Sequence, residues 1–424
     1  MSKSFKFITG VVLAAGKGVR MNSQLPKVLH KLCGLPLIYY PLSLLSSLHL
    51  KNIIVVLGHK KEEVKEEIVK EFKGINFACQ RVLNGSAKAL ESALKYVDTP
   101  YLLVMCADSS FLDKKVFQKA ISFHISKRNA CTVLSRESSS PSSLGRIIRD
   151  SRNEILEIRE EVDLDRKNMP SLKEVNAGIY IFNREELSKQ IKKVKPHPKK
   201  KEYFLTDIIE IFRRKNYKVR AFKVGEREIF YSVNSLKDLI EAEKVVRTYL
   251  IEGLIDKGVR ILDPQTTFLG PKTFIGKNSV IYPFTFLENN VKIGNSCGVG
   301  PFVHLREGTV IGDNSYIGNF TELVRTKLSS RVKMKHFGYL GDTEVGSKVN
   351  IGAGVVTANF DGKKKSKTKI SDSAFIGSDT IIVAPVKIGK SAFTGAGSVI
   401  TKDVEDKTLV VGVPAKKVRE IKNV

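Results

Sequence analysis

The stretch FIGKNSVIYPFTFLENNVKIGNSCGVGPFVHLREGTVIGDNSYIGNFTEL (274–323) decides the fold of the C-terminal half of the chain. Every sixth residue in it is aliphatic, at nine successive positions from Ile275 to Leu323. Residue types with a background frequency of roughly 30–40% do not form such a series by chance. The six-residue period fits neither an α-helix nor a simple alternating strand. It is typical of a parallel β-helix in which one aliphatic side chain per short strand points inward.

The same register returns at Ile370, Ile376, Ile382 and Ile388, slips at Thr394 and recovers at Ile400. Because three hexads make one triangular coil, we expect a parallel β-helix domain over residues 254–424. A helical pattern with acidic residues near its start precedes this domain and predicts a linker helix over residues 235–253.

The N-terminal half alternates short apolar runs with helical patterns. The runs are ITGVVLAAG (8–16), NIIVVLG (52–58), YLLVMCAD (101–108) and GIYIF (178–182). This alternation predicts an α/β doubly wound, mainly parallel sheet over residues 1–234. Ligands of such sheets bind at the carboxyl ends of the strands.

Composition bounds the function. The chain has 424 residues, more than one core supports, and 71 Lys and Arg against 44 Asp and Glu, a formal charge of +27. Such a charge attracts polyanions such as nucleic acid, anionic membranes or nucleotides. Much of the excess lies in the runs 192–201 and 363–369, so a lysine-rich solvated surface is the favoured interpretation. The chain has no tryptophan and no basic platform with interleaved aromatics, which disfavours nucleic acid as a partner.

The sequence also indicates a cytoplasmic location. Its five cysteines are dispersed without metal-ligand or redox spacing, as expected of reduced thiols. The apolar run that follows Lys6 is short for a signal peptide and leads into a glycine-rich loop. No apolar run approaches the roughly 20 residues of a membrane span.

The segment LAAGKGVRMNSQLPKVLH (13–30) has the features of a phosphate-binding loop. Gly16 and Gly18 let the backbone approach a triphosphate, with amide groups directed at its oxygens. Arg20 and Lys27 bring positive charge to the same anion. The position after a first strand and before a helix strengthens this interpretation.

This segment resembles the sugar-1-phosphate nucleotidyltransferases, and the whole chain resembles the bifunctional N-acetylglucosamine-1-phosphate uridyltransferase/glucosamine-1-phosphate acetyltransferase family. The resemblance implies UTP and N-acetylglucosamine-1-phosphate as substrates, Mg²⁺ as cofactor, and a product used in cell wall biogenesis. It implies catalytic roles for Lys27 and Arg20, and metal binding by Asp108 and Asn234. The nucleotide- and sugar-binding residues implied are Leu13, Ala14, Ala15, Gly16, Lys27, Gln80, Gly85, Ser86, Gly145, Glu160, Asn176 and Asn234.

Phosphoryl-type transfer agrees with these residue types, because it depends mainly on positioning and charge neutralisation. The sugar phosphate attacks the α-phosphorus of UTP in line, pyrophosphate leaves, and no protein nucleophile is needed. A hard oxygen ligand such as Asp108 suits magnesium. Lys27 and Arg20 can stabilise the charge on the phosphates.

The segment 300–362 resembles the acetyltransferase core of the same family, whose fold is a left-handed hexapeptide-repeat β-helix. The resemblance implies glucosamine-1-phosphate and acetyl-CoA as substrates, a homotrimer with active sites between subunits, and His336 as general base. Histidine suits this role because its side chain can take up a proton near neutral pH. The residues implied to hold the sugar phosphate are Arg306, Tyr339 and Asn350. Those implied to bind acetyl-CoA are Asn359, Phe360, Ser378 and Ala396.

The chain departs from the family pattern at several positions. Val19, Ala107, Ser110 and Val162 stand where the family has other residues in the first site. In the second site, Val324 replaces a phosphate-binding lysine, with Arg325 adjacent, and Phe360 replaces a tyrosine.

Three other interpretations were weighed. One is a monofunctional sugar-1-phosphate uridyltransferase whose degenerate β-helix serves trimerisation, and His336 argues against it. Another is a catalytically silent regulatory subunit, which would have no need of Lys27 and Asp108. The third is a nucleic-acid binder. The bifunctional enzyme is the favoured hypothesis.

Overall fold

The computed structural model describes residues 4–110, 113–138, 144–164, 172–225 and 231–420. The chain forms two compact units. The first comprises residues 1–32 and 36–243, and the second comprises residues 33–35 and 244–424. The division falls inside helix α7 (Leu236–Ile255). Within the described ranges, no helix is long and apolar enough to cross a membrane.

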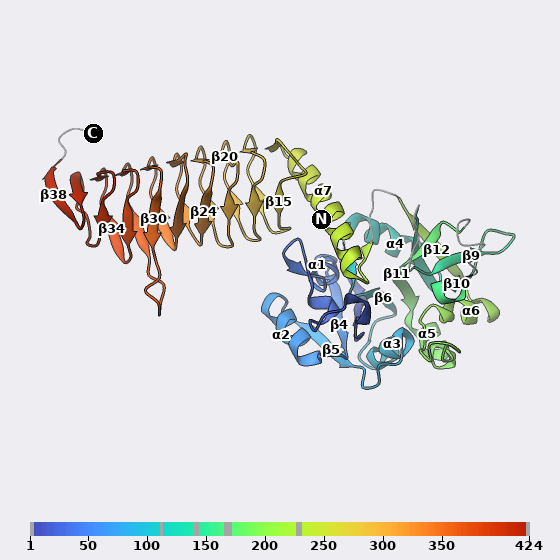
Figure 1. Cartoon of the computed structure of the whole chain (residues 1–424). Coiled ribbons are helices and arrows are strands. Elements are labelled where there is room, and N and C mark those ends of the chain that lie inside the picture. Colours follow the sequence, from blue (N-terminus) through green and yellow to red (C-terminus); the bar gives the residue numbers. More distant parts are fainter. Residues whose placement is uncertain (1–3, 111–112, 139–143, 165–171, 226–230, 421–424) are drawn as a thin grey trace. The chain divides into compact units, whose positions relative to one another are not determined.

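A nine-stranded sheet forms the centre of the first unit, with the strand order β10-β9-β11-β6-β1-β4-β5 and with β8 joining β11 to β12 (Figure 1). Its strands are β1 (Phe5–Ala14), β4 (Leu50–Leu57), β5 (Ile75–Cys79), β6 (Tyr101–Cys106), β8 (Cys131–Glu137), β9 (Arg146–Arg149), β10 (Ile155–Arg159), β11 (Glu174–Asn183) and β12 (Val219–Val224).

The parallel part of this sheet confirms the predicted α/β architecture. Strand β1 pairs in parallel with β4 and β6, and β4 pairs in parallel with β5. Beyond β6 the sheet becomes mixed, because β11 runs antiparallel to both β6 and β8. The predicted run 178–182 therefore lies in an antiparallel strand.

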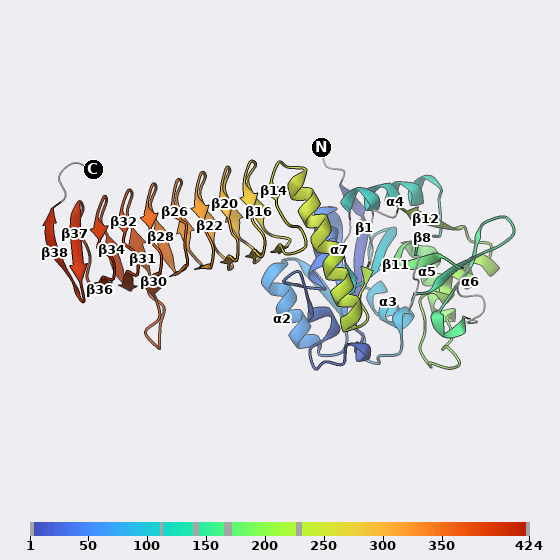
Figure 2. The ribbon, with the colours of Figure 1, turned by 45° about the horizontal axis from the view of Figure 1, so that its top comes forward.

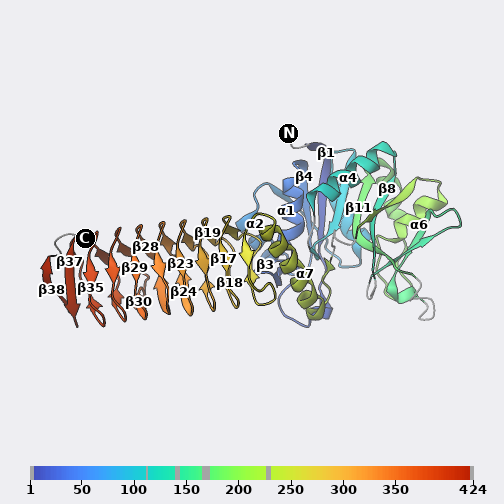
Figure 3. The same cartoon turned by 90° about the horizontal axis from the view of Figure 1, so that it is seen from above.

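Helices cover both faces of this sheet (Figure 3). Buried residues of α1 (Tyr39–Ser47), α2 (Lys61–Glu71) and α4 (Lys114–Ser126) belong to one apolar cluster. Those of α3 (Ser86–Leu94), α5 (Arg184–Gln190) and α6 (Asp207–Arg214) belong to the other. The four-residue spacing of Val64 and Ile68 places both on the buried face of α2. The sheet thus has a helical layer on each side.

The second unit is a parallel β-helix whose strands form three stacked sheets (Figure 2). The first sheet contains β14 (Arg260–Ile261), β17 (Val280–Ile281), β20 (Gly298–Val299), β23 (Tyr316–Ile317), β26 (Lys333–Met334), β29 (Asn350–Ile351), β32 (Phe375–Ile376), β35 (Phe393–Thr394), β37 (Thr408–Gly412) and β38 (Ala415–Glu420). The second contains β15 (Phe268–Leu269), β18 (Phe286–Leu287), β21 (His304–Leu305), β24 (Thr321–Val324), β27 (Gly338–Gly341), β30 (Val355–Ala358), β33 (Ile381–Val383) and β36 (Val399–Ile400). The third contains β16 (Phe274–Ile275), β19 (Lys292–Ile293), β22 (Val310–Ile311), β25 (Lys327–Leu328), β28 (Thr343–Val345), β31 (Thr368–Ile370) and β34 (Val386–Ile388).

The predicted hexads are confirmed, because all nine aliphatic residues from Ile275 to Leu323 are buried in one continuous core. The glycine that follows many of them is required by the close stacking of the coils. At Gly294, for example, a Cβ atom would lie 2.7 Å from the backbone nitrogen of Asp313 in the next coil. The interior therefore selects an aliphatic side chain, and the adjacent turn selects a glycine.

The sequence register is lost between residues 323 and 370 although the β-helix continues. Two steps of five residues, from Leu323 to Leu328 and from Leu340 to Val345, each shift the hexads by one position. A longer excursion follows β30, where Phe360 bridges Lys365 in an antiparallel hairpin that projects from the coil (Figure 1). The inward positions in this interval are Leu328, Met334, Leu340, Val345 and Ile351.

Thr394, where the aliphatic register slips, still occupies a buried position of strand β35. Its hydroxyl accepts a hydrogen bond from the backbone nitrogen of Gly377 at 3.0 Å and lies 2.9 Å from the hydroxyl of Thr380. A buried hydroxyl that is hydrogen-bonded avoids most of the cost of its desolvation. Thr394 is therefore a polar member of the core and does not interrupt the coil.

Candidate functional sites

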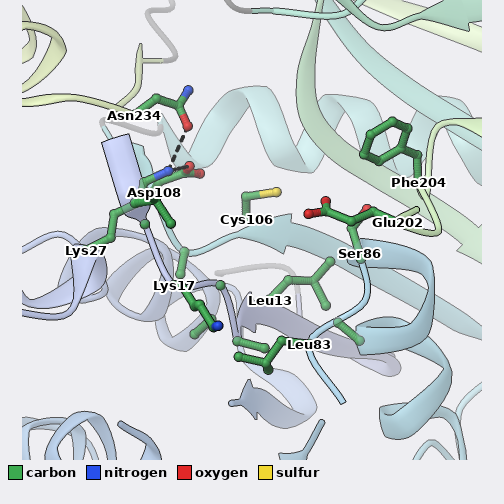
Figure 4. Close-up of a pocket in the computed structure, with 18 of the residues that line it drawn as sticks. Leu13, Lys17, Lys27, Leu83, Ser86, Cys106, Asp108, Glu202, Phe204 and Asn234 are labelled. Atoms are coloured by element: carbon green, nitrogen blue, oxygen red, sulfur yellow. Dashed lines mark hydrogen bonds and ion pairs between the residues drawn. The ribbon is translucent and has the colours of Figure 1, made fainter. Parts of the chain in front are cut away.

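A cavity of about 930 Å³ opens at the carboxyl ends of β1 and β6 in the first unit (Figure 4). This is where ligands of doubly wound sheets bind. It brings together most of the residues predicted for the nucleotide and sugar site. Those that line it are Leu13, Ala14, Ala15, Gly16, Arg20, Lys27, Gln80, Gly85, Ser86, Asp108, Glu160 and Asn234.

The predicted phosphate loop leaves β1 and passes through two short 3-10 helices, Val19–Met21 and Lys27–Leu29, before α1 begins. Gly18 has a φ of 63°, and a Cβ atom there would lie 2.4 Å from the Cβ of Lys27. Only glycine lets the loop fold back on Lys27 in this way. At Gly16, by contrast, a Cβ atom would meet no atom within 4 Å. Gly18 thus shapes the loop, and Gly16 faces open space.

Lys27, Asp108 and Asn234 converge at one end of the cavity (Figure 4). The Lys27 ammonium forms an ion pair with Oδ2 of Asp108 and donates a hydrogen bond to Oδ1 of Asn234 at 2.8 Å. Asp108 and Asn234 are brought together by pairing of β7 (Ser109–Ser110) with β13 (Tyr231–Ser232). Two oxygens from distant segments therefore face the same cation.

The chemistry of this donor set also fits a magnesium ion. Oδ1 of Asp108 is buried without a hydrogen-bond partner in the described structure. Together with Oδ1 of Asn234 it supplies the hard oxygen atoms that Mg²⁺ prefers. Within the described part of the chain, no group of three or more His, Cys, Asp or Glu residues could hold a metal ion. Mg²⁺ often uses one or two protein oxygens and completes its shell with water and substrate phosphates.

The predicted base-recognition stretch is anchored by a segment far away in the sequence. A Cβ atom at Gly85, where φ is 118°, would lie 2.4 Å from the backbone oxygen of Tyr203. The Ser86 hydroxyl accepts a hydrogen bond from the backbone nitrogen of Leu205 at 2.9 Å. Gln80 donates to the carbonyl oxygen of Gly85 at 3.1 Å. These contacts fix the loop that begins α3 against the cavity.

The three predicted sugar-binding residues have different environments. Glu160 lines the cavity, and a Cβ atom at Gly145 would lie 3.6 Å from its Oε2. Asn176 donates to the Tyr180 hydroxyl at 2.7 Å and accepts from the backbone nitrogen of Gly178 at 3.0 Å. Among the described residues, neither Gly145 nor Asn176 belongs to the cavity lining. Glu160 therefore faces the cavity, whereas Asn176 is bonded to its own strand.

Sequence reasoning missed one wall of the cavity. Lys200, Glu202 and Phe204 line it, although the run 192–201 was interpreted as a solvated surface. The segment is held at its base by His197, whose Nε2 lies 2.8 Å from Oδ2 of Asp163. The segment is placed at the cavity by the contact of Tyr203 with the loop at Gly85. Periodicity does not reveal this contact, because the two residues are far apart in the sequence.

Cys106, the last residue of β6, was also not predicted as a site residue. It lines the cavity between the Asp108 and Glu202 ends (Figure 4). Burial raises the pKa of its thiol to about 12, and the neighbouring Asp108 adds to this shift. The Cys106 side chain is therefore a neutral, weakly polar part of the wall.

The predicted acetyl-transfer residues lie on two edges of the β-helix. His336, Ser378 and Ala396 occupy turns that lead from the first sheet to the second, which we call the first edge. Arg306 and Asn359 directly follow strands of the second sheet, on what we call the second edge. The remaining residues are Tyr339 in β27 between the edges, Asn350 in β29 of the first sheet, and Phe360 at the base of the hairpin.

His336 and Arg306 differ in their contacts. His336 is exposed, and its imidazole has no hydrogen-bond partner in the described residues. The guanidinium of Arg306 lies 3.3 Å from Glu322 and 3.7 Å from Glu288. A phosphate that binds to Arg306 therefore competes with two carboxylates.

A hydrogen-bonded cluster links two predicted residues to two others. Asp342 forms a bidentate ion pair with Arg325, at 2.6 and 2.7 Å, and accepts from Nδ2 of Asn359 at 2.6 Å. The Tyr339 hydroxyl lies 3.5 Å from Oδ1 of Asn359. Val324 is buried beside this cluster. Arg325, which is adjacent to Val324 in the sequence, is thus paired with Asp342.

Comparison with known proteins agrees with the fold and the cavity. Residues 9–247 match the nucleotidyl transferase family, and residues 290–325 match the bacterial transferase hexapeptide repeat. These matches define a transferase with a nucleotidyltransferase domain and a hexapeptide-repeat domain. The chain belongs to the family of the bifunctional protein GlmU, with relatives of that name aligned over nearly its whole length.

The protein of Thermoanaerobacter pseudethanolicus is 36% identical over 437 residues, which cover 95% of this chain and 94% of that protein. The protein of Thermodesulfovibrio yellowstonii is 36% identical over 435 residues and covers 95% of both chains. The protein of Thermosipho africanus is 37% identical over 436 residues, with coverage of 95% and 94%. Among solved structures, the inositol-1-phosphate CTP transferase of T. maritima matches 58% of this chain and 98% of its own, at 17% identity and a TM-score of 0.48.

The acidic residues beside the cavity make the first unit sensitive to pH. Burial raises the pKa of Glu160, whose Oε1 accepts a hydrogen bond from Thr206 at 2.7 Å. Burial, together with the charge of Glu160, raises the pKa of Asp207 to about 6. Because the pKa of Asp207 is higher in the folded than in the unfolded chain, the fold is more stable when this carboxyl group is protonated. The stability from Asp207 is therefore present at low pH and lost as the pH rises through about 6.

We expect Asp207→Asn to flatten the pH dependence of stability of the first unit between about pH 4 and pH 7, because asparagine mimics the protonated carboxyl. Thermal unfolding at several pH values should show that the stability of the variant, relative to that of the wild type, increases as the pH rises. Asp98→Asn, at an exposed position, serves as the control. An Asp207→Asn offset that is the same at every pH would contradict the assigned cause.

Proposed function

We propose that this protein makes UDP-N-acetylglucosamine in two reactions. Residues 254–424 acetylate glucosamine-1-phosphate with acetyl-CoA, and residues 1–234 transfer a uridylyl group from UTP to N-acetylglucosamine-1-phosphate, with residues 235–253 as the linker. The observation that carries the proposal is the convergence of Lys27, Asp108 and Asn234 beside the phosphate loop in one cavity. Membership of the GlmU family over both domains supports the acetyl transfer.

In the uridylyl transfer, the phosphate oxygen of the sugar phosphate forms a bond to the α-phosphorus of UTP. The bond from that phosphorus to the bridging oxygen breaks, and pyrophosphate leaves with the electron pair. The backbone at Gly16 and the charges of Arg20 and Lys27 neutralise the triphosphate. Gln80, Gly85 and Ser86 hold the base, and Glu160 accepts hydrogen bonds from the sugar. Gly145 and Asn176 support that end of the cavity.

Mg²⁺ bound by Asp108 and Asn234 would supply additional positive charge to the phosphates. The oxygens of Asp108 and Asn234 share the Lys27 ammonium in this structure, so Mg²⁺ held by these oxygens would leave that ammonium available to the substrate phosphates. In this proposal the Lys27 ammonium pairs with Asp108 in the absence of substrate and with the substrate phosphates during the reaction.

In the acetyl transfer, the amine nitrogen of the sugar forms a bond to the carbonyl carbon of acetyl-CoA, and the carbon–sulfur bond breaks. His336 takes the proton from the amine, and the departing thiolate takes up a proton. The exposed imidazole of His336, with no partner among the described residues, supports this role. Arg306, Tyr339 and Asn350 hold the sugar phosphate. Acetyl-CoA is held by Asn359, Phe360, Ser378 and Ala396.

A homotrimer completes this second site in our proposal. The site residues of one chain are divided between the two edges of the β-helix, which supports completion by a second copy. The first edge also carries a column of exposed phenylalanines. Phe302 stacks between Phe284 and Phe320 at centroid distances of 4.8 and 5.1 Å. Exposed apolar patches of this kind mark protein interfaces.

One observation favours the alternative of a uridyltransferase whose β-helix serves only trimerisation. Val324 is buried and apolar, so this position offers no cation to a second phosphate. Assay of acetyl transfer separates the two proposals.

The substrates and the five cysteines, all free thiols, support a cytoplasmic location. Small anionic substrates also account for the basic loop without nucleic acid as a partner. A substantial fraction of the protein in a membrane or periplasmic extract would contradict this location.

Replacing Asp108 with asparagine should lower the rate of UDP-N-acetylglucosamine formation by about 10²–10³-fold, because a charge that organises the reacting phosphates is lost. Pyrophosphate release from UTP and N-acetylglucosamine-1-phosphate measures this rate. Asp98→Asn is the matched control, and acetyl transfer by the same preparation should persist. Loss of both activities with the fold intact would refute the two-site assignment.

Replacing His336 with alanine should lower acetyl transfer by about 10²–10⁴-fold, as expected for loss of a general base. Release of free thiol from acetyl-CoA in the presence of glucosamine-1-phosphate measures the rate. The adjacent exposed Lys335→Ala variant is the control, and uridylyl transfer should be unchanged in both. Equal rates in the His336 and Lys335 variants would rule out the proposed base.

Replacing Phe302 with aspartate should weaken the trimer, because it puts a charge at the centre of the stacked column. Sedimentation velocity measures the change in assembly. Phe274→Asp is the control, since Phe274 is also exposed (61%, against 46% for Phe302) but lies on the third sheet. A monomeric wild-type protein, or equal effects of the two substitutions, would contradict the assignment of this interface.

A further inference from the structure

Arg325 occupies an unusual position beside the proposed acetyl-transfer site. It lies on the second edge of the β-helix, directly after β24, and adopts a left-handed backbone conformation with a φ of 48°. Its side chain is 42% exposed, whereas that of its partner Asp342 is only 14% exposed. Asp342 is the fixed member of the pair, because it also accepts a hydrogen bond from Asn359.

Arg325 is a neighbour of two proposed acceptor-binding residues. The turn that begins at Arg306 stacks directly beneath it, since a Cβ atom at Gly308 would lie 3.5 Å from Cγ of Arg325. On the other side, Tyr339 lies across Gly341, where a Cβ atom would be 2.5 Å from the Tyr339 hydroxyl. The nearby Tyr339 is among the causes that raise the pKa of Arg325, after its hydrogen bond to Asp342. Arg306 and Arg325 thus follow strands of the second sheet in successive coils, and Tyr339 lies in the next strand of that sheet.

The bond to Asp342 indicates which ligand Arg325 would bind. A guanidinium group presents two parallel N–H donors, and a carboxylate or a phosphate offers two oxygens at matching positions. Asp342 fills this fork with distances of 2.6 and 2.7 Å. An exposed ion pair of this kind contributes little to stability. The geometry is therefore that of a preformed oxyanion fork, closed by a carboxylate of the protein itself.

We propose that Arg325 binds the phosphate group of the acetyl acceptor together with Arg306, and that Asp342 and Asn359 hold its guanidinium in position between turnovers. This inference rests on the proposed acetyl transfer to glucosamine-1-phosphate. It accounts for a cationic phosphate site at an edge where Val324 is buried and apolar. The incoming phosphate replaces the Asp342 carboxylate as the partner of the fork.

The test is acetyl-transfer kinetics of the full-length protein with Arg325→Ala and Arg325→Lys. The alanine variant should raise the KM for glucosamine-1-phosphate by about 10- to 100-fold, the effect of losing a hydrogen bond to a charged group, with the KM for acetyl-CoA little changed. The lysine variant should fall between alanine and wild type, because it keeps the charge but lacks the fork. Arg331→Ala is the matched control, an exposed arginine with a φ of 64° on another edge.

Glucose-1-phosphate, which has no amine to acetylate, probes the phosphate subsite directly as an inhibitor. Its inhibition constant should rise in Arg325→Ala by the same factor as the KM. An unchanged constant, or an effect equal to that of Arg331→Ala, would overturn the inference. An unchanged KM for acetyl-CoA in the same samples reports that the β-helix of the variants is folded. If the wild-type protein does not acetylate glucosamine-1-phosphate, the proposed acetyl transfer and this inference both fail. If the wild type is active and Arg325→Ala leaves the KM and the inhibition constant unchanged, only the inference fails.

Discussion

The narrow interior of the β-helix is the constraint on which the second half of the molecule depends. Each coil admits one inward side chain per strand, and the backbones of successive coils approach so closely that the adjacent turn position is often glycine. No polar group with catalytic use fits inside such a core. Chemistry is therefore confined to the outer surface, and residues far apart in sequence become neighbours only along an edge. His336 and Arg306 both lie on this outer surface, on different edges.

In the first unit, the central sheet brings residues that are far apart in the sequence together. Its central strands end at a common edge, and the side chains that follow β1 and β6 share one cavity. Gly18 and Gly85 are the points where the backbone has to be glycine, because each packs against another segment more closely than a Cβ atom permits. The phosphate loop and the base-recognition loop are thus shaped by contacts with Lys27 and Tyr203. These contacts set the backbone of both loops at the wall of the cavity.

Local patterns predicted much of this structure. The hexads gave the β-helix because its contacts repeat every coil, and the apolar runs predicted β1, β4 and β6 because these strands are buried on both faces. The five-residue steps after Leu323 and Leu340 hid the middle coils, since a shift of one residue destroys a fixed register. The wall formed by Lys200, Glu202 and Phe204 could not be predicted, because it depends on one long-range contact and a charged run has no periodicity. Likewise, a sequence does not reveal that Arg325 and Asp342 form a pair.

The two proposed phosphate sites share one physical arrangement. In each, a cation from the protein is paired with a carboxylate, Lys27 with Asp108 and Arg325 with Asp342. Such a pair keeps the cation ordered and limits its attraction for stray anions, since a ligand has to offer more than the carboxylate it replaces. A sugar phosphate or a triphosphate meets this condition because it carries more charge than a carboxylate, whereas a simple monoanion does not. Selectivity for phosphorylated substrates then follows from competition within the protein, and the large excess of surface lysine does not need to contribute to it.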